Sequence, residues 1–195
     1  MVVIACGTAS ANAFETLKNE FSIPIRTVIE PTAKAVTASK IGVIATKSTI
    51  SSGAWEDAIH AYDPECSIIS KACPLFVPIV EENLLDTPIS KNAIEMYLTE
   101  FKESNIENLI LGCTHYPILL KEIQEFLPTI KITNVNIHSA KDSKRFLEET
   151  NSLNLSRKLP EVFAYTTDDV TNFETMAKRF CNISFNKKSF KKVVI

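Results

Sequence analysis

The stretch Val2-Val3-Ile4-Ala5-Cys6-Gly7-Thr8 decides how this sequence is interpreted, because Leu109-Ile110-Leu111-Gly112-Cys113-Thr114 repeats its pattern. Each stretch is an apolar run that leads to a cysteine, which a threonine follows either directly or after one glycine. Apolar runs that do not alternate with polar residues are typical of strands buried on both faces, as in a parallel sheet. The sequence therefore predicts two buried strands, each with a cysteine at its carboxyl end.

Further strands and helices alternate along the chain, which predicts an α/β fold with mainly parallel sheets. The other expected strands are Ile25–Ile29, Ile41–Ala45, Ser67–Ser70, Ile132–Ile137 and Val162–Thr166. Helical periodicity predicts helices at Ser10–Glu20, Ser52–Ala61, Ser90–Ser104, Leu119–Phe126, Lys141–Thr150 and Asn172–Arg179.

The chemistry of the repeated pattern follows from the position of its cysteines. In open α/β sheets ligands bind beyond the carboxyl ends of the strands, where the next helix offers free N–H groups that favour a thiolate. A buried cysteine that only fills space is the simpler interpretation of either stretch alone. Two such stretches favour a pseudo-symmetric cleft with Cys6 on one wall and Cys113 on the other.

Composition excludes several classes of protein. The 195 residues are 45% hydrophobic and 23% charged, the balance of a soluble globular protein with one large domain or two small ones. A net charge of −2 gives no general attraction to nucleic acid or to an anionic membrane surface. No apolar run reaches the ~20 residues of a membrane helix, and no signal peptide is recognisable. We expect no nucleic-acid or membrane partner and a cytoplasmic location.

The counts of glycine and cysteine exclude further kinds of site. Four glycines are too few for a glycine-rich phosphate loop, and five cysteines without a C-x-x-C pair do not indicate a disulfide framework or a zinc site. We therefore expect no metal. Two facing thiols suit a racemase or epimerase, which removes a proton from one face of a carbon and returns one to the other. Cysteine has a reference pKa of about 8.5, so a thiol and a thiolate can coexist near neutral pH.

The residues also resemble a known family, the cofactor-independent glutamate racemases. The resemblance covers almost the whole chain. It lies in Ala5–Ala11, Ile29-Glu30-Pro31, Ile41–Thr46 with Ser52-Gly53, Ala72–Pro78 with Glu81, Leu111–Pro117 and Thr167-Asp168-Asp169.

The resemblance implies the roles of the site residues. Cys6 and Cys113 would be the two acid/base thiols, acting on the α-carbon of glutamate without pyridoxal phosphate or metal. Thr8, Thr114 and His115 would hold the substrate, His115 would also assist Cys113, and Glu81 matches an acidic residue near the cleft. The product, D-glutamate, would serve peptidoglycan synthesis, and with it cell-wall biogenesis and cell shape.

The resemblance also implies an architecture of two similar α/β lobes with the active cleft between them. The first lobe would comprise residues 1–26 and 139–195, and the inserted second lobe residues 27–138. In the family about 70 further residues precede the first cysteine motif, equivalent to two βα units of the first lobe. We therefore expect the first lobe to be truncated, the strand Val2–Ala5 to lie at an exposed edge, and the partner to be a second copy or a separate N-terminal piece.

A second departure from the family pattern is Gly7, where the family has an asparagine that contacts the substrate. Gly7 supplies only backbone. Because of this and of the missing N-terminal residues, we expect the 195-residue chain to be impaired as a racemase. Two alternatives stay open: a non-catalytic remnant or interaction module of the same fold, and a related cysteine-based enzyme that acts on aspartate or another small diacid.

Overall fold

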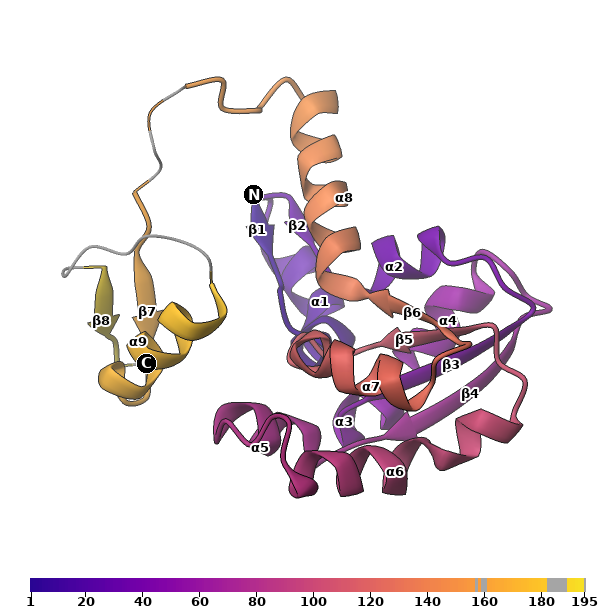
Figure 1. The fold of residues 1–195 in the computed structure, drawn as a ribbon. Coiled ribbons are helices and arrows are strands. Elements are labelled where there is room, and N and C mark those ends of the chain that lie inside the picture. The colour runs from indigo at the N-terminus through magenta and orange to yellow at the C-terminus, as the bar shows by residue number, and fades with distance from the viewer. Residues whose placement is uncertain (157, 159–160, 182–188, 195) are drawn as a thin grey trace. The chain divides into compact units, whose positions relative to one another are not determined.

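A computed structural model describes residues 1–156, 158, 161–181 and 189–194. The chain comprises two compact units, Met1–Leu153 and Asn154–Ile195. Both contain parallel strands with helices between them (Figure 1). The prediction of an α/β fold with mainly parallel sheets is therefore confirmed.

The centre of the first unit is a four-stranded sheet in the order β4-β3-β5-β6. Its strands are β3 (Lys40–Ala45), β4 (Ser67–Ala72), β5 (Asn108–Leu111) and β6 (Lys131–Asn134). All three pairings are parallel. The carboxyl ends of the four strands consequently lie along one edge of the sheet, where α/β proteins bind their ligands.

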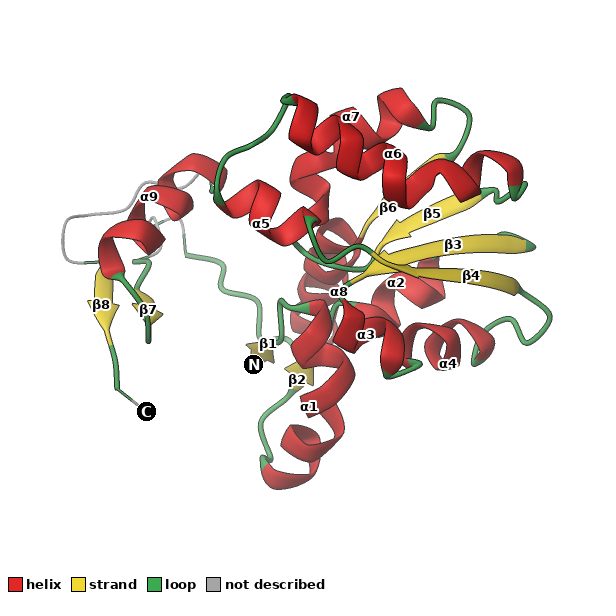
Figure 2. Cartoon of the chain, turned by 90° about the horizontal axis from the view of Figure 1, so that it is seen from below, coloured by secondary structure: helices red, strands yellow, loops and turns green. Residues whose placement is uncertain are grey.

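Helices cover both faces of this sheet (Figure 2). One face carries α6 (Pro88–Glu103) and α7 (Leu120–Phe126), and the other carries α2 (Ile29–Ala35) and α4 (Ala54–His60). Shorter helical segments follow the strands: α3 (Lys47–Ser51), α5 (Phe76–Glu81) and the 3₁₀ turn η1 (Tyr116–Leu119).

The central strand β3 shows why its sequence is apolar without alternation. Ile41 and Val43 pack in a cluster with Trp55 of α4, on one face of the sheet. Gly42 faces the other side, where a Cβ atom added to it would lie 2.9 Å from side-chain atoms of Leu109 and of Phe101 in α6. Both faces are thus filled, which confirms the prediction of a strand buried on both sides.

A separate two-stranded parallel sheet is formed by β1 (Val2–Val3) and β2 (Ile25–Arg26). α1 (Gly7–Glu20) follows β1, and α8 (Val135–Glu149) packs against α2. In a two-stranded sheet both strands are edges, and Val2 and Val3 are 41% and 37% exposed. β1 is therefore an edge strand with exposed apolar side chains, as expected for a truncated first lobe, and the prediction from its composition that it is buried on both faces is wrong.

Two predicted strands run into the helix that follows them. The expected strand Ile25–Ile29 ends at Arg26, and Ile29 begins α2. The expected strand Ile132–Ile137 ends at Asn134, because the side chain of Asn134 accepts a hydrogen bond from the Asn136 N–H (2.9 Å) and caps α8. A β-branched run predicts a strand, but the cap decides where the helix starts. α8 consequently begins six residues before the predicted Lys141.

The second unit contains β7 (Ala164–Thr166), α9 (Val170–Phe180) and β8 (Phe190–Lys192). The two strands are parallel, and the rings of Phe173 and Phe190 meet edge to face at 5.7 Å. The predicted lobes, 1–26 with 139–195 and 27–138, do not coincide with these units, since the first unit contains parts of both. The lobe boundaries stay a prediction.

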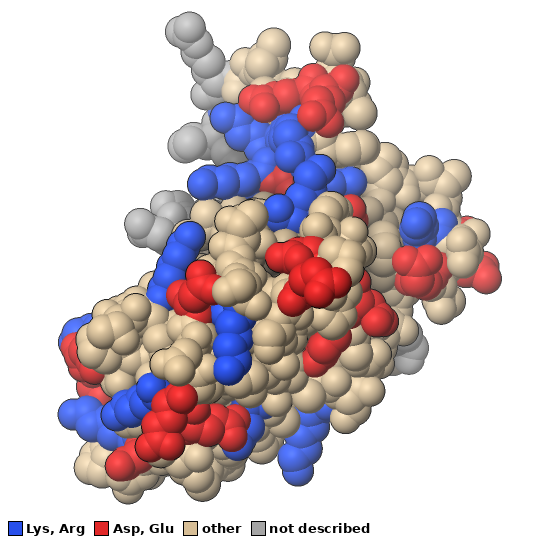
Figure 3. Space-filling view, turned by 90° about the vertical axis from the view of Figure 1, so that its right-hand side faces the viewer, with Lys and Arg blue, Asp and Glu red and all other residues tan. Residues whose placement is uncertain are grey.

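Surface charge is mixed. On the face seen in Figure 3, basic and acidic side chains are interspersed, in keeping with the net charge of −2. Among the helices of the described residues, none is long and apolar enough to span a membrane.

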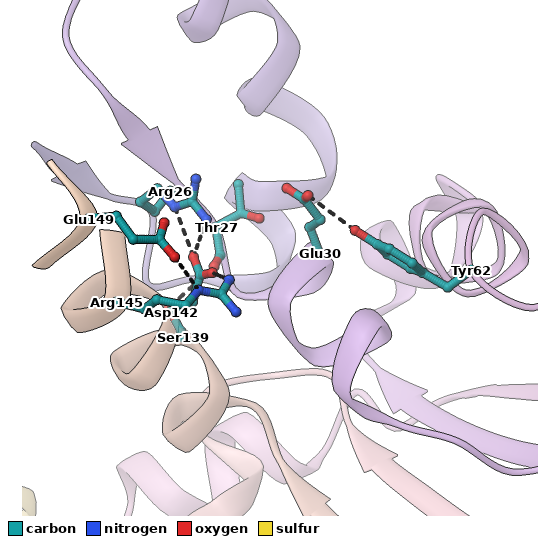
Figure 4. A network of polar contacts seen from close by, with 8 residues as sticks. All are labelled: Arg26, Thr27, Glu30, Tyr62, Ser139, Asp142, Arg145 and Glu149. Carbon is teal, nitrogen blue, oxygen red and sulfur yellow. Dashed lines mark hydrogen bonds and ion pairs between the residues drawn. The ribbon is translucent and has the colours of Figure 1, made fainter. Parts of the chain in front are cut away.

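A network of ion pairs joins β2 to α8 (Figure 4). The carboxylate of Asp142 is only 5% exposed and accepts hydrogen bonds from Arg26 Nε (2.8 Å) and Nη2, and from Arg145 Nη2 (2.5 Å). Ser139 adds a hydrogen bond from its hydroxyl to the Thr27 carbonyl (3.2 Å). α8 is thereby fixed to the segment that connects β2 with α2.

Substitution of Asp142 tests this attachment. Asp142→Ala leaves the Arg26 guanidinium without its buried partner, so we expect the free energy of unfolding to fall by about 2 kcal/mol. Glu148→Ala, on the same helix, removes only an exposed pair with Lys144 and should change it by less than about 0.5 kcal/mol. Urea denaturation followed by circular dichroism measures both. Equal losses in the two variants would contradict the assigned role of Asp142.

Candidate active site

The segments that follow β1 and β5 are in direct contact. Cys6 is the N-cap residue of α1, and Cys113 comes two residues after β5. The Thr114 hydroxyl donates a hydrogen bond to the Ala5 carbonyl (3.3 Å). A Cβ atom built on Gly7 would lie 2.2 Å from the Gly112 carbonyl oxygen. The structure thus brings together the two cysteine-bearing segments that the sequence predicts to face each other.

The two thiols have different environments. Cys6 is exposed, whereas Cys113 is only 7% exposed. Burial raises the pKa of the Cys113 thiol, and the backbone N–H groups of His115 and Tyr116 partly oppose this by lowering it. Negative charge on Cys6 also raises the pKa of Cys113, so the two groups are close enough to interact electrostatically.

Three threonine hydroxyls form a cluster at the start of α1. Thr8 Oγ1 lies 2.8 Å from Thr46 Oγ1 and 3.2 Å from Thr49 Oγ1, and the latter two are 2.9 Å apart. Thr46 follows β3 and caps α3 by accepting a hydrogen bond from the Thr49 N–H. Such a cluster can offer hydroxyl donors to a carboxylate.

Of this cluster, the sequence predicts Thr8 alone as a site residue. Thr46 and Thr49 could have been found from their position directly after the buried strand Ile41–Ala45. The carboxyl end of that strand lies at the same sheet edge as Cys113.

His115 and Glu81 form a second polar pair. His115 Nε2 lies 3.3 Å from Glu81 Oε1, and the two side chains are 34% and 47% exposed. Glu81 is the last residue of α5. A carboxylate in this place can orient the imidazole for proton transfer or for substrate binding.

Buried contacts hold the loop that carries Cys113 and His115. Tyr116 is fully buried, donates a hydrogen bond from its hydroxyl to the Cys73 carbonyl (2.7 Å) and meets the Phe76 ring edge to face at 5.1 Å. Asn136 Nδ2 donates to the Thr114 carbonyl (3.3 Å). Burial raises the pKa of the Cys73 thiol to about 12, so this cysteine is protonated at neutral pH and packs as a small apolar group.

The polar groups at this edge of the sheet are therefore thiols, hydroxyls and an imidazole paired with a carboxylate. Within the described ranges, no group of three or more His, Cys, Asp or Glu side chains is arranged to hold a metal ion. The groups present can bind a small polar substrate and transfer protons.

Comparison with known proteins identifies the family. The sequence profile of the Asp/Glu/Hydantoin racemases matches residues 1–140, and the chain belongs to this family. The glutamate racemase of Aquifex aeolicus is 44% identical over 182 residues, which are 91% of this chain and 68% of the relative. That of Hydrogenobaculum is 47% identical over 139 residues, 69% of this chain and 53% of the relative. The predicted membership of an amino-acid racemase family is confirmed.

Solved structures of glutamate racemases are also similar to this chain. The structure of a glutamate racemase isoform from Bacillus anthracis aligns with a TM-score of 0.92 at 33% identity, over 99% of this chain and 73% of that one. The glutamate racemase of Francisella tularensis, solved in complex with D-glutamate, aligns with a TM-score of 0.89 at 32% identity, over 98% and 72%. Like the two sequence relatives, both proteins are longer than the segment that this chain matches.

The different environments of the thiols predict different reactivity. In the folded chain we expect iodoacetamide to modify the exposed Cys6 and Cys181 first, and the buried Cys66, Cys73 and Cys113 only slowly. Because burial raises its pKa, the rate at Cys113 should keep increasing as the pH rises beyond about 8.5, the ordinary pKa of a thiol. Peptide mass spectrometry after timed labelling measures each site. Labelling of Cys113 as rapid as that of Cys181 at pH 7 would contradict this environment.

Proposed function

We propose that this chain has the activity of its glutamate racemase relatives and interconverts L- and D-glutamate by proton transfer between Cys6 and Cys113. The observation that carries the proposal is the contact between the two segments that bear these cysteines. The names and identities of the relatives support the choice of glutamate as the substrate.

The proposed reaction balances without a cofactor. The thiolate of one cysteine takes the proton from the α-carbon and becomes a thiol, while the electron pair of the broken C–H bond is delocalised into the substrate carboxylate. The thiol of the other cysteine then gives its proton to the opposite face of the carbon and becomes the thiolate. The pair as a whole keeps one proton, and its roles exchange with the direction of reaction.

The environment of Cys113 indicates which thiol starts as the acid. Its burial raises its pKa, so Cys113 holds its proton at neutral pH before substrate binds. In this first half-reaction we assign the base to Cys6, which is exposed at the N-terminus of α1.

The neighbouring groups supply substrate contacts in this proposal. Thr8 and Thr114 offer hydroxyls, Gly7 offers its backbone N–H at the start of α1, and His115 binds the substrate and assists Cys113. Glu81 orients the imidazole across a distance of 3.3 Å. In this proposal no metal or organic cofactor takes part, so these groups stabilise the charge that develops on the substrate.

The wider role follows from the product. D-Glutamate would be supplied for peptidoglycan synthesis, and thus for the cell wall and cell shape, in the cytoplasm. The chain spans 53% of the length of one relative and 68% of another. Impaired activity of these 195 residues alone, and association with a second copy or a separate N-terminal piece, stay predictions.

Exchange with solvent deuterium tests the proposal. Each glutamate enantiomer is incubated separately in D₂O with the purified chain, and the α-proton is followed by NMR and the enantiomer by chiral chromatography. We expect slow exchange coupled to inversion. Cys6→Ser and Cys113→Ser should each abolish inversion, because an alcohol is far too weak an acid at neutral pH.

The control is Cys181→Ser, which removes an exposed cysteine of the second unit and should leave the rate unchanged. Full inversion by either active-site variant would remove that cysteine from the mechanism. Inversion of aspartate but not of glutamate would instead support the related cysteine-based enzyme.

A further inference from the structure

A groove between α2 and α8 lies apart from the candidate active site. Its volume is about 370 Å³, and its charged and titratable lining residues are Lys34 of α2 and His138, Lys141, Asp142 and Arg145 of α8. None of the residues assigned to the proposed reaction lines it. The groove therefore offers a second place where a small polar molecule can bind.

Helix geometry brings the basic side chains to this groove. His138, Lys141 and Arg145 follow one another at intervals of three and four residues, which places them on one face of α8. Lys34 comes from the last turn of α2, the helix that packs against α8. Four basic residues from two helices thus surround one groove, in a chain whose net charge is −2.

The carboxylate in the groove wall belongs to Asp142 and is already engaged by two cations. Its Oδ2 accepts hydrogen bonds from Arg26 and its Oδ1 accepts one from Arg145 (Figure 4). Among the described residues, the side chains of the other three titratable groove residues have no hydrogen-bond or ion-pair partner: Lys34, His138 and Lys141. An excess of positive charge is consequently left in the groove.

The imidazole of His138 lies in this positive field. Burial lowers its pKa, and the positive charges of Lys141 and of Lys131 in β6 lower it further. Glu30, the acidic residue of α2, does not line the groove and accepts a hydrogen bond from the Tyr62 hydroxyl (3.3 Å) instead. His138 is therefore neutral at neutral pH, and an anion in the groove would favour its protonated form.

We propose that the groove between α2 and α8 binds a phosphate group, either of inorganic phosphate or of a small phosphate monoester. Lys34, Lys141 and Arg145 supply charge-assisted hydrogen bonds, and His138 adds a further donor when it is protonated. A phosphate dianion has the charge and the acceptor oxygens to satisfy several cations at once, whereas a carboxylate carries a single charge. The site does not depend on the proposed function, because the two share no residue.

The imidazole of His138 reports directly on an anion in the groove. The chain contains three histidines, so their ring protons can be followed by NMR, and His138→Gln assigns one resonance by removing it. Sulfate is the first probe because it stays divalent across the titration, with sodium chloride at equal ionic strength as the reference. We expect saturating sulfate to raise the pKa of His138 by about one unit, equivalent to about tenfold tighter binding to the protonated ring.

Two substitutions at exposed positions remove the lysines. Lys34→Gln and Lys141→Gln should each weaken the binding of phosphate about tenfold at about pH 8, where phosphate is mainly a dianion. Lys141→Gln should also raise the pKa of His138 in the absence of any added anion, since one of the positive charges beside it is lost. The matched control is Lys144→Gln, on the same helix but outside the groove wall. It removes only an exposed pair with Glu148 and should change neither quantity.

A comparison of ligands separates the two sources of a phosphate group. Inorganic phosphate and glycerol 1-phosphate are titrated at about pH 8 and followed by the shift of the same resonance. Tighter binding of the ester identifies a phosphate monoester as the ligand, and equal or tighter binding of phosphate identifies the free ion. L-Glutamate should leave the His138 resonance unchanged, whether or not the chain racemises it.

The same measurements can overturn the proposal. It fails if the His138 resonance and its pKa are the same in sulfate as in chloride, or if Lys34→Gln and Lys141→Gln bind phosphate as tightly as the parent chain. A shift with glutamate as large as that with phosphate would contradict the choice of ligand. Racemisation is not measured in these experiments, so a failure of the proposed function leaves their outcome unchanged.

Discussion

The hydrogen bond from the Gly112 N–H to the Ile44 carbonyl determines where the site can form. It extends the parallel pairing of β3 and β5 one residue beyond Leu111, so the backbone that carries Cys113 is fixed by the sheet and not by a free loop. From this fixed point Gly112 contacts Gly7, and Thr114 reaches the Ala5 carbonyl. β1 and β5 are strands of different sheets. The contacts of Gly7 with Gly112 and of Thr114 with Ala5 nevertheless place the segment after β1 against the end of β5.

The two cysteine-bearing segments have similar sequences, but the structure places their thiols in different environments. Cys113 follows β5 and is only 7% exposed, and burial favours its neutral thiol. Cys6 lies at the start of α1, exposed to solvent. This difference between the two thiols arises from burial, since both side chains are cysteine.

Much of the fold was predictable because the periodicity of buried strands is a local signal. The runs Ile41–Ala45 and Leu109–Leu111 lie within one residue of β3 and β5. Errors occur where a local pattern competes with a cap or with packing. Val135 and Ile137 look like the end of a strand, but the capping side chain of Asn134 starts α8 there. α5, with six residues, is too short to show a helical period.

For the site, the sequence by itself determined the identity of the chemical groups. The order strand, cysteine, threonine places Cys6 and Cys113 at strand ends, and the motif around His115 assigns the family. Only the tertiary structure decided which groups meet. The cluster of Thr8 with Thr46 and Thr49 joins residues about 40 positions apart. The contact of Gly7 with Gly112 depends on the distance between the two backbones in space, which cannot be predicted from the number of residues between them. The physical reason is that periodicity reports which face of an element is buried, whereas the close approach of two backbones is set by the packing of β1, β3, β5 and α4 together.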